Sequence, residues 1–144
     1  MTNETTSQRI SDQNQALARR FFAAQDELRG GPAPELCAEG YQAHLGGNPP
    51  VERAGHQAFA EAFYAAFDGM SHDVRVVIAD ASGVAVRFVL RGVHTGAFFG
   101  IPATGRAATI AANVLLEIED GKVKTLYGMF DEAGMLRQLG VLPG

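Results

Sequence analysis

Apolar residues recur at helical spacing in two stretches of the first half of the chain. Those of the first stretch share one helical face and are Leu17, Phe21, Ala24 and Leu28. We expect this helix to begin after Ser11 as its N-cap, behind a flexible tail of residues 1–10, and to end at Gly30. A second helix is predicted for residues 52–67, with a buried face made of Phe59, Ala62, Phe63, Ala66 and Phe67.

Beyond residue 70 the pattern changes to the two-residue alternation that is typical of β-strands. In the first such segment Val74, Val76 and Ile78 alternate with Asp73, Arg75 and Val77. Further strands are predicted at residues 84–94, 106–119 and 123–130, and a short strand at residues 41–45 precedes the second helix. This order of elements indicates an α+β fold in a single domain of residues 11–144, with the helices on one face of a curved sheet.

Composition narrows the function classes. The 144 residues are 47% hydrophobic and 19% charged, which is typical of a globular protein and not of a disordered one. A net charge of −4 leaves no basic surface for phosphates, so nucleic acid is not an expected partner. No apolar run is long enough to span a membrane, the N-terminus lacks a signal peptide, and the lone Cys37 fits a reducing compartment, so we expect a cytoplasmic protein. The four histidines lack metal-ligand spacing, and no metal is predicted.

One acid stands at an unusual place, between an apolar strand and a helix. Asp131 follows the strand of residues 123–130 and begins the helical stretch of residues 131–140. As an N-cap, its side-chain oxygen would accept a hydrogen bond from a free amide of the first turn. As a catalyst, it would face a cavity and exchange protons with a ligand. Both roles are compatible, because one oxygen can cap while the other points inward.

Several local strings resemble the SnoaL-like polyketide cyclases, a family with the nuclear-transport-factor-2-like fold. Residues 92–96 (GVHTG) and 100–106 (GIPATGR) resemble the family's loop between two long strands. Residues 119–123 (EDGKV) resemble its hairpin, and Phe130-Asp131 with residues 136–140 (LRQLG) resembles its strand-end acid and closing helix. The resemblance implies a cone-shaped domain, in which a curved antiparallel sheet wraps around N-terminal helices and encloses a central pocket, often in a homodimer packed through the sheet.

The resemblance also implies a reaction. Asp131 would be the acid/base of an intramolecular aldol-type ring closure without any cofactor, and His94 would assist it by donating to a carbonyl oxygen or by holding the carboxylate. The substrate would be a small apolar or aromatic polyketide-type molecule. Many relatives carry a Trp in the strand before the acid, where this chain has Leu126-Tyr127-Gly128, so the shape of the substrate is expected to differ.

Six residues are predicted to bind the substrate. Tyr127 and Met129 share the strand parity of Asp131, so they are expected to line the same cavity. The other four are His44, Asn113, Phe63 and Phe88. For Tyr127 a buried tyrosine with an ordinary partner is the alternative, and Asn113 either binds substrate or joins the sheet strands. His56 and His72 are expected to be surface or helix-start residues.

The sequence is also compatible with two other functions. Arg87 and Arg91 project from one strand face, and an arginine that links two acids would favour an epoxide-opening enzyme of the same fold, with Asp73 or Asp80 as a second acid. Alternatively, the domain binds a hydrophobic ligand without catalysis. Phe98-Phe99 lies on a glycine-flanked loop, where it would form a lid or a dimer contact.

Overall fold

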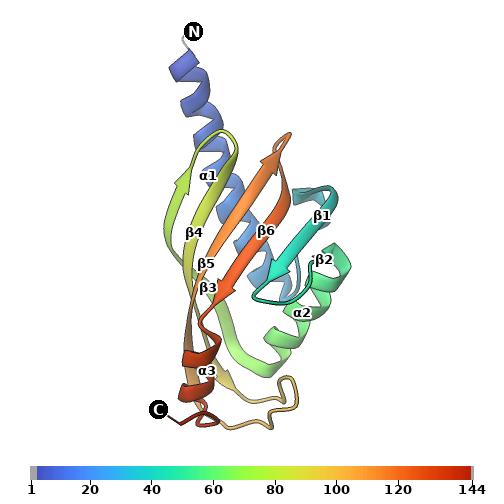
Figure 1. The fold of residues 1–144 in the computed structure, drawn as a ribbon, viewed down its shortest axis with the longest axis vertical. Helices are drawn as coiled ribbons and strands as arrows, with labels where there is room; N and C mark the ends of the chain where they lie inside the picture. The colour runs from blue at the N-terminus through green and yellow to red at the C-terminus, as the bar shows by residue number, and fades with distance from the viewer. Residues whose placement is uncertain (1–2, 144) are drawn as a thin grey trace.

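A computed structural model describes residues 3–143 as three helices and a curved sheet (Figure 1). The elements in chain order are α1 (Asn3–Leu28), the 3-10 helix η1 (Pro34–Leu36), β1 (Cys37–Leu45), β2 (Val51–Glu52), α2 (Arg53–Ala66), β3 (Phe67–Ala79), β4 (Gly83–His94), β5 (Ala107–Glu119), β6 (Lys122–Phe130) and α3 (Glu132–Gln138). The first and last described residues lie at opposite ends of the long axis. None of the helices in this part of the chain is long and apolar enough to cross a membrane.

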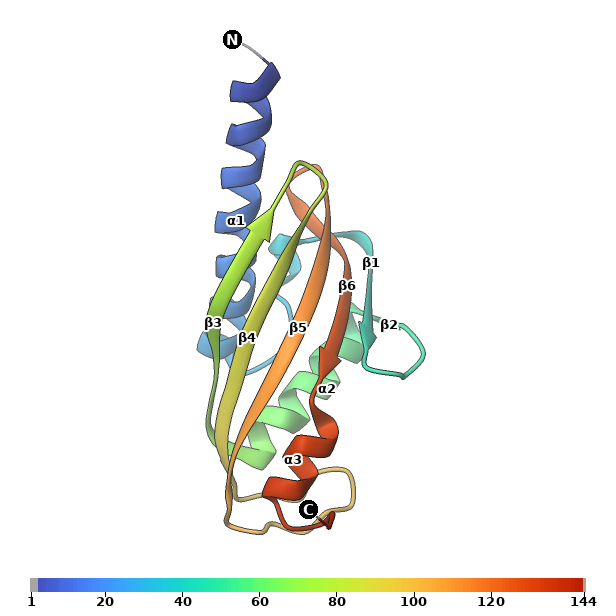
Figure 2. The same ribbon diagram turned by 60° about the vertical axis from the view of Figure 1, so that its left-hand side comes forward.

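The six strands form one sheet in the order β2-β1-β6-β5-β4-β3. Neighbours pair antiparallel except β1 and β6, which run parallel, so the sheet is mixed where the sequence predicted an antiparallel one. At the β5–β6 hairpin Asp120 and Gly121 both have positive φ, as a type I′ turn requires. Helices α1 and α2 lie together against one face of the sheet (Figure 2). The predicted α+β fold is confirmed.

Helix α1 is longer than its sequence pattern predicted. It begins at Asn3, so Ser11 lies inside the helix and does not cap it. Its buried stripe consists of Asn14, Leu17, Ala18, Phe21, Phe22 and Gln25. The helix ends at Leu28, because Arg29 has a φ of +52°. Leu28, predicted on the buried face, is 65% exposed. Two of the buried side chains on this face, Asn14 and Gln25, are polar.

Strand β3 contains an irregularity that the alternation rule missed. Its pairing with β4 shifts register between Val74 and Val76, and such a bulge turns the following side chains to the opposite face. Val76 and Ile78 are consequently exposed, and Val77 packs against the core in their place. Strand β4 has no such shift, and its even positions Val84, Val86, Phe88 and Leu90 are buried as predicted.

Candidate functional site

Two adjoining chambers lie between the helices and the sheet. The inner chamber has a volume of about 50 Å³ and is lined by Phe22, Gln25, Leu45, His56, Phe59, Ala60, Phe63, Tyr64, Met70, His72, Phe88, Leu90, Val114, Leu126 and Phe130. The outer chamber has a volume of about 430 Å³ and is lined by Leu45, Gly46, Gly47, Asn48, Phe59, Phe63, Phe98, Phe99, Ile110, Phe130, Glu132 and Met135. The four residues common to both sets are apolar, so a ligand that bridges the chambers passes an apolar neck.

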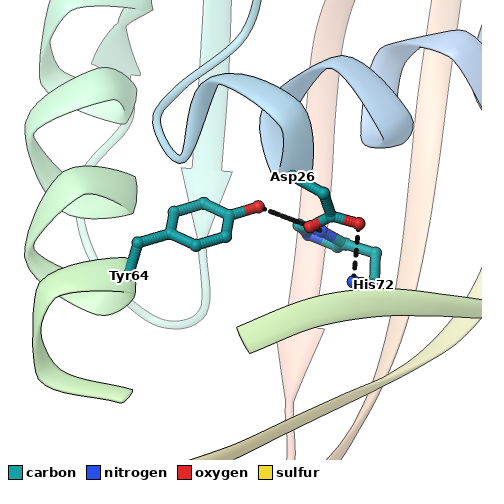
Figure 3. Close-up of polar contacts among 3 residues, drawn as sticks. All are labelled: Asp26, Tyr64 and His72. Atoms are coloured by element: carbon teal, nitrogen blue, oxygen red, sulfur yellow. Dashed lines mark hydrogen bonds and ion pairs between the residues drawn. The ribbon is translucent and has the colours of Figure 1, made fainter. Parts of the chain in front are cut away.

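Beside the inner chamber, Tyr64 of α2 and His72 of β3 both contact the carboxylate of Asp26, which lies on α1 (Figure 3). The Tyr64 hydroxyl donates to Asp26 Oδ1 at 2.6 Å, and the same oxygen lies 2.7 Å from His72 Nδ1. The backbone N–H of His72 donates to Asp26 Oδ2 at 2.9 Å. Asp26 therefore fixes the position of both the backbone and the ring of His72.

The carboxylate of Asp26 is held in its charged form. Burial alone would raise the pKa of Asp26, but the hydrogen bonds and the charge of His72 and the hydrogen bond of Tyr64 outweigh it and lower that pKa below its usual value. Burial and the bond to Asp26 raise the pKa of Tyr64, which stays a neutral donor. Because the anion accepts from His72 Nδ1, that nitrogen carries a proton, and Nε2 of the same ring is left for a ligand.

The imidazole of His72 is also clamped by aromatic rings. Phe22 and Phe88 lie with their ring centroids 5.2 Å and 4.8 Å from that of His72. No described residue forms a hydrogen bond with His72 Nε2, while His72 itself lines the inner chamber. The arrangement places a histidine ring, oriented by a carboxylate, on the wall of an apolar cavity. Such a pair can act as a general base and then return the proton as an acid.

A second histidine lies at the inner chamber. His56, on α2, is only 6% exposed, and its Nδ1 lies 2.8 Å from the hydroxyl of Tyr41 on β1. Burial, with a smaller contribution from the charge of His72, lowers the pKa of His56 to about 4. Burial also raises the pKa of Tyr41, so both partners are neutral near pH 7.

His56 and His72 were predicted to be surface or helix-start residues. His56 does lie in the first turn of α2, but it is buried, and His72 lies within β3 and lines the inner chamber, so the prediction is wrong for His72 and holds for His56 only in its place at the helix start. His56 is in helical register with Ala60 and Tyr64, which are also buried, and this stripe is a signal that the sequence contains. His72 pairs with the buried Leu90, but the register shifts of β3 hide its parity. Gln25 and Asp26 could have been found from the sequence only through their position at the end of the buried stripe of α1.

Asp131 is the N-cap of α3. Its Oδ1 accepts a hydrogen bond from the backbone N–H of Gly134 at 3.0 Å, so the capping prediction is confirmed. The residue is exposed and lines neither chamber, so the predicted position on the cavity wall is wrong. The reason is the alternation of side chains along β6. The even positions Leu126 and Phe130 face the chambers, and Asp131, at the next odd position, caps α3.

His94 is fully buried, with no exposed surface, but it is not a chamber residue. The backbone N–H of Thr104 donates to His94 Nδ1 at 3.2 Å, and the ring stacks on Phe67 at a centroid distance of 5.1 Å. This contact ties the end of β4 to the loop that precedes β5. Among the described residues nothing bonds to His94 Nε2.

Four of the predicted substrate-binding residues lie away from the chambers. Tyr127 and Met129 are 41% and 66% exposed, because the odd positions of β6 face the outer side of the sheet. Asn113 is exposed as well and accepts a hydrogen bond from Arg87 at 3.2 Å. His44 stacks on Tyr127 with ring centroids 4.7 Å apart, beside the parallel β1–β6 pair. The prediction that Tyr127 and Met129 line the cavity is wrong.

The structure places the two predicted phenylalanines on the chamber walls. Phe63 lines both chambers, and Phe88 lines the inner one. In the loop before β5, Phe98 is buried against Phe63, whereas Phe99 is 71% exposed with φ +43° and lines the outer chamber. Phe99 therefore forms part of the mouth.

The paired charges that suggested epoxide opening lie outside the chambers. Arg91 lies 3.7 Å from Asp73 on the outer face of the sheet, and Asp73 also binds Arg75. Asp80 accepts hydrogen bonds within its own turn. In residues 3–143, no group of three or more His, Cys, Asp or Glu side chains is arranged to hold a metal ion.

Known proteins share both sequence features and architecture with this chain. Residues 15–139 match the family of SnoaL-like polyketide cyclases. A candidate SnoaL-like polyketide cyclase from Jannaschia sp. CCS1 is similar in structure, with a TM-score of 0.79, 23% identity, and coverage of 93% of this chain and 96% of that one. No curated protein matches in sequence.

Two Streptomyces proteins are also similar. AclR, a candidate hydroxylase from Streptomyces galilaeus, has a TM-score of 0.82 at 22% identity, with coverage of 92% of this chain and 99% of AclR. IdmH, a candidate polyketide cyclase from Streptomyces antibioticus, has a TM-score of 0.70 at 28% identity, with coverage of 90% and 97% respectively. Similarity to AclR at this identity concerns the fold alone.

Proposed function

This chain belongs to the SnoaL-like polyketide cyclase family, and on that premise we propose that it closes a ring in a small polyketide-type molecule by cofactor-independent acid/base catalysis. The observation that carries the proposal is the Asp26–His72 pair, in which Asp26 holds Nδ1 of a histidine ring that lines an apolar chamber. We assign the acid/base role to this pair, in place of the sequence-based assignment to Asp131 and His94.

The chemistry follows from the properties of a carbon acid. His72 Nε2 removes a proton from a carbon next to a carbonyl group, and the C–H electron pair becomes the enolate. That carbon then attacks a second carbonyl carbon of the same molecule, a C–C bond forms, and the new alkoxide takes the proton back from His72. Asp26 stabilises the imidazolium in between, as a carboxylate partner does for a catalytic histidine. The product has the mass of the substrate.

The chamber walls supply the remaining requirement, which is a folded substrate. Phe59, Phe63 and Phe130 line both chambers and pack against one another or against Phe99 through ring contacts of about 6 Å. An apolar chain held between these rings is brought into reacting geometry, and such positioning lowers the barrier to an intramolecular reaction by several kcal/mol, up to about 7–11.

The test is turnover of a panel of linear and partly cyclised polyketide esters, followed by mass and retention time. We expect ring closure without mass change in the wild type, a loss of about 100-fold or more in His72→Gln, and a smaller loss in Asp26→Asn. Asp131→Asn, His94→Gln and the outer-face variant His44→Gln are compared in parallel.

Three outcomes would overturn the assignment. Full activity of His72→Gln with inactive Asp131→Asn would return the role to Asp131. Addition of one water to candidate epoxides would indicate epoxide opening. Tight binding without turnover by every variant would indicate a ligand-binding module.

For the assembly we propose a homodimer that packs through the outer face of the sheet. Exposed apolar side chains gather on β3, β4, β5 and β6, and they are Val76, Ile78, Val93, Leu115, Tyr127 and Met129. Apolar groups of this extent on a soluble domain mark interaction surfaces. Sedimentation equilibrium should give a dimer for the wild type and a monomer for the Leu115→Glu/Met129→Lys variant, and a monomeric wild type would contradict the proposal.

A further inference from the structure

The inner chamber contains a polar group that takes no part in the proton transfer proposed for His72. Gln25, on α1, is only 2% exposed and lines this chamber, and its Nε2 has no hydrogen-bond partner among the described residues. A buried amide donor without a partner is destabilising and rare in folded proteins. The unmet donor therefore indicates that an acceptor atom of a bound molecule completes this site.

His56, which also lines this chamber, carries a second N–H donor. The Tyr41 hydroxyl is buried and has no other acceptor within the described chain, so its hydrogen is directed at His56 Nδ1. With Nδ1 accepting, the proton of the neutral ring is on Nε2. Tyr41 thus fixes the tautomer in which His56 carries an N–H on the edge of the ring that is turned away from Tyr41.

The charges around these donors disfavour an anionic ligand. Among the described residues that line either chamber, none is a lysine or an arginine. The carboxylate of Asp26 lies behind His72, and Glu132 lines the outer chamber. The one cationic group among these described residues that a carboxylate could meet is His72, whose charge is already paired with Asp26, whereas a neutral carbonyl oxygen needs only the two donors.

We propose that Gln25 and His56 form an oxygen-binding subsite that receives a neutral ketone of the substrate, with the enolisable carbon next to it facing His72. This inference rests on the proposed function and adds the substrate class and its orientation: the molecule enters ketone first. As His72 removes the proton, the C–H electrons move onto the ketone oxygen, and the two N–H donors stabilise the enolate that forms. Preorganised donors of this kind supply a large part of the catalysis in many enzymes.

The volumes of the two chambers fit this orientation. A cavity of about 50 Å³ holds a group of a few atoms, such as a terminal acetyl group. The outer chamber, at about 430 Å³, has the size of a site for a ring-sized ligand. The polar end of the substrate therefore belongs in the inner chamber, and its apolar remainder belongs between the phenylalanines of the outer one.

Binding of three naphthalene probes tests the subsite without turnover. The probes are 2-acetylnaphthalene, its isostere 2-isopropenylnaphthalene, which lacks the acceptor oxygen, and 2-naphthoate. We expect the wild type to bind the ketone about 10-fold more tightly than the alkene, and the carboxylate more weakly than the ketone. Gln25→Leu should weaken binding of the ketone about 3- to 10-fold and leave binding of the alkene unchanged.

His56→Phe is examined in the Tyr41→Phe background, so that no tyrosine hydroxyl is left without a partner. The His56→Phe change should reduce the preference for the ketone over the alkene about as much as Gln25→Leu does. Gln42→Leu, at an exposed position of β1, is the matched control and should keep the preference. Gln25→Leu also reports on folding: it should raise the midpoint of urea unfolding, because the unpaired donor is gone.

The outcomes separate this inference from the proposed function. Equal affinity for the ketone and the alkene, no binding of the ketone, or an unchanged preference in Gln25→Leu would overturn the subsite. The ketone preference should persist in His72→Gln. If that variant still catalyses ring closure while the preference depends on Gln25, the base assignment fails and the subsite stands. If catalysis depends on His72 and the wild type shows no preference for the ketone, the base assignment stands and the subsite fails.

Discussion

Acidification should destabilise the protein through His56, and this loss should begin above the pH range in which carboxylates are protonated. The pKa of His56 is about 4 in the folded chain, against an ordinary value of 6.5. As the pH falls, the unfolded chain binds this proton first, so the contribution is fully present above pH 6.5 and is lost progressively down to about pH 4.

The size of the effect follows from the same two values. At about 1.4 kcal/mol per pH unit, the gap between 6.5 and about 4 corresponds to a loss of about 3 kcal/mol of unfolding free energy. Marginal stability of a domain of this size is about 5–15 kcal/mol, so the loss is a large fraction of the total. The physical cause is that a charged imidazole is poorly solvated in the buried site beside Tyr41.

The assay is urea unfolding followed by far-UV circular dichroism at several pH values between 7 and 4. The variant is His56→Gln, whose amide oxygen can accept the Tyr41 hydroxyl but does not titrate. The wild type should lose about 3 kcal/mol more than this variant over the range, and the control variant His44→Gln should keep the wild-type dependence. Equal pH dependence of the wild type and His56→Gln would refute the reasoning.

Three further predictions concern stability. Asp26→Asn should cost about 2–4 kcal/mol of unfolding free energy at pH 7, because it weakens three hydrogen bonds to a carboxylate. Since the pKa of Asp26 is lowered in the folded chain, the difference between wild type and variant should disappear as the pH falls below 3.8, the ordinary pKa of this group. Glu27→Gln on the same helix is the control and should have little effect at any pH. Asp131→Ala should cost about 1 kcal/mol in thermal unfolding through loss of the α3 cap, and Asp131→Ser should restore most of it; equal melting temperatures would contradict the capping role. Gly31→Ala should cost about 2–3 kcal/mol because its Cβ would overlap the backbone of Gln57, while Gly47→Ala, in open space, should be nearly neutral.

The fold was predictable because its signals are local. Strand alternation in β4, the Asp120-Gly121 turn and the strings shared with the cyclase family each depend on residues close together in the chain. The parallel pairing of β1 with β6 was missed, because strand direction depends on how distant segments meet. The register shift in β3 was missed because a bulge adds one residue without a distinctive residue type.

Part of the pocket wall was predictable from the sequence, and the proposed acid/base pair was not. A small apolar pocket with one oriented acid/base was expected, and Phe63 and Phe88 were placed correctly on its wall. In the sequence, Asp131 is the conspicuous candidate base, because it stands at the end of an apolar strand. The Asp26–His72 pair instead joins α1 to β3, residues 46 positions apart, through a contact that no periodicity encodes.

The parallel pairing of β1 with β6 also has a consequence for how the protein folds. Ala43 lies beside Leu126, so this pair forms only after the chain has closed a loop of more than 80 residues, which is slow and costs entropy. Leu126 and Phe130, which line the inner chamber, arrive with the same strand. During synthesis the helices and the β3–β4 hairpin can assemble early, but the inner chamber is completed only after β6 has left the ribosome.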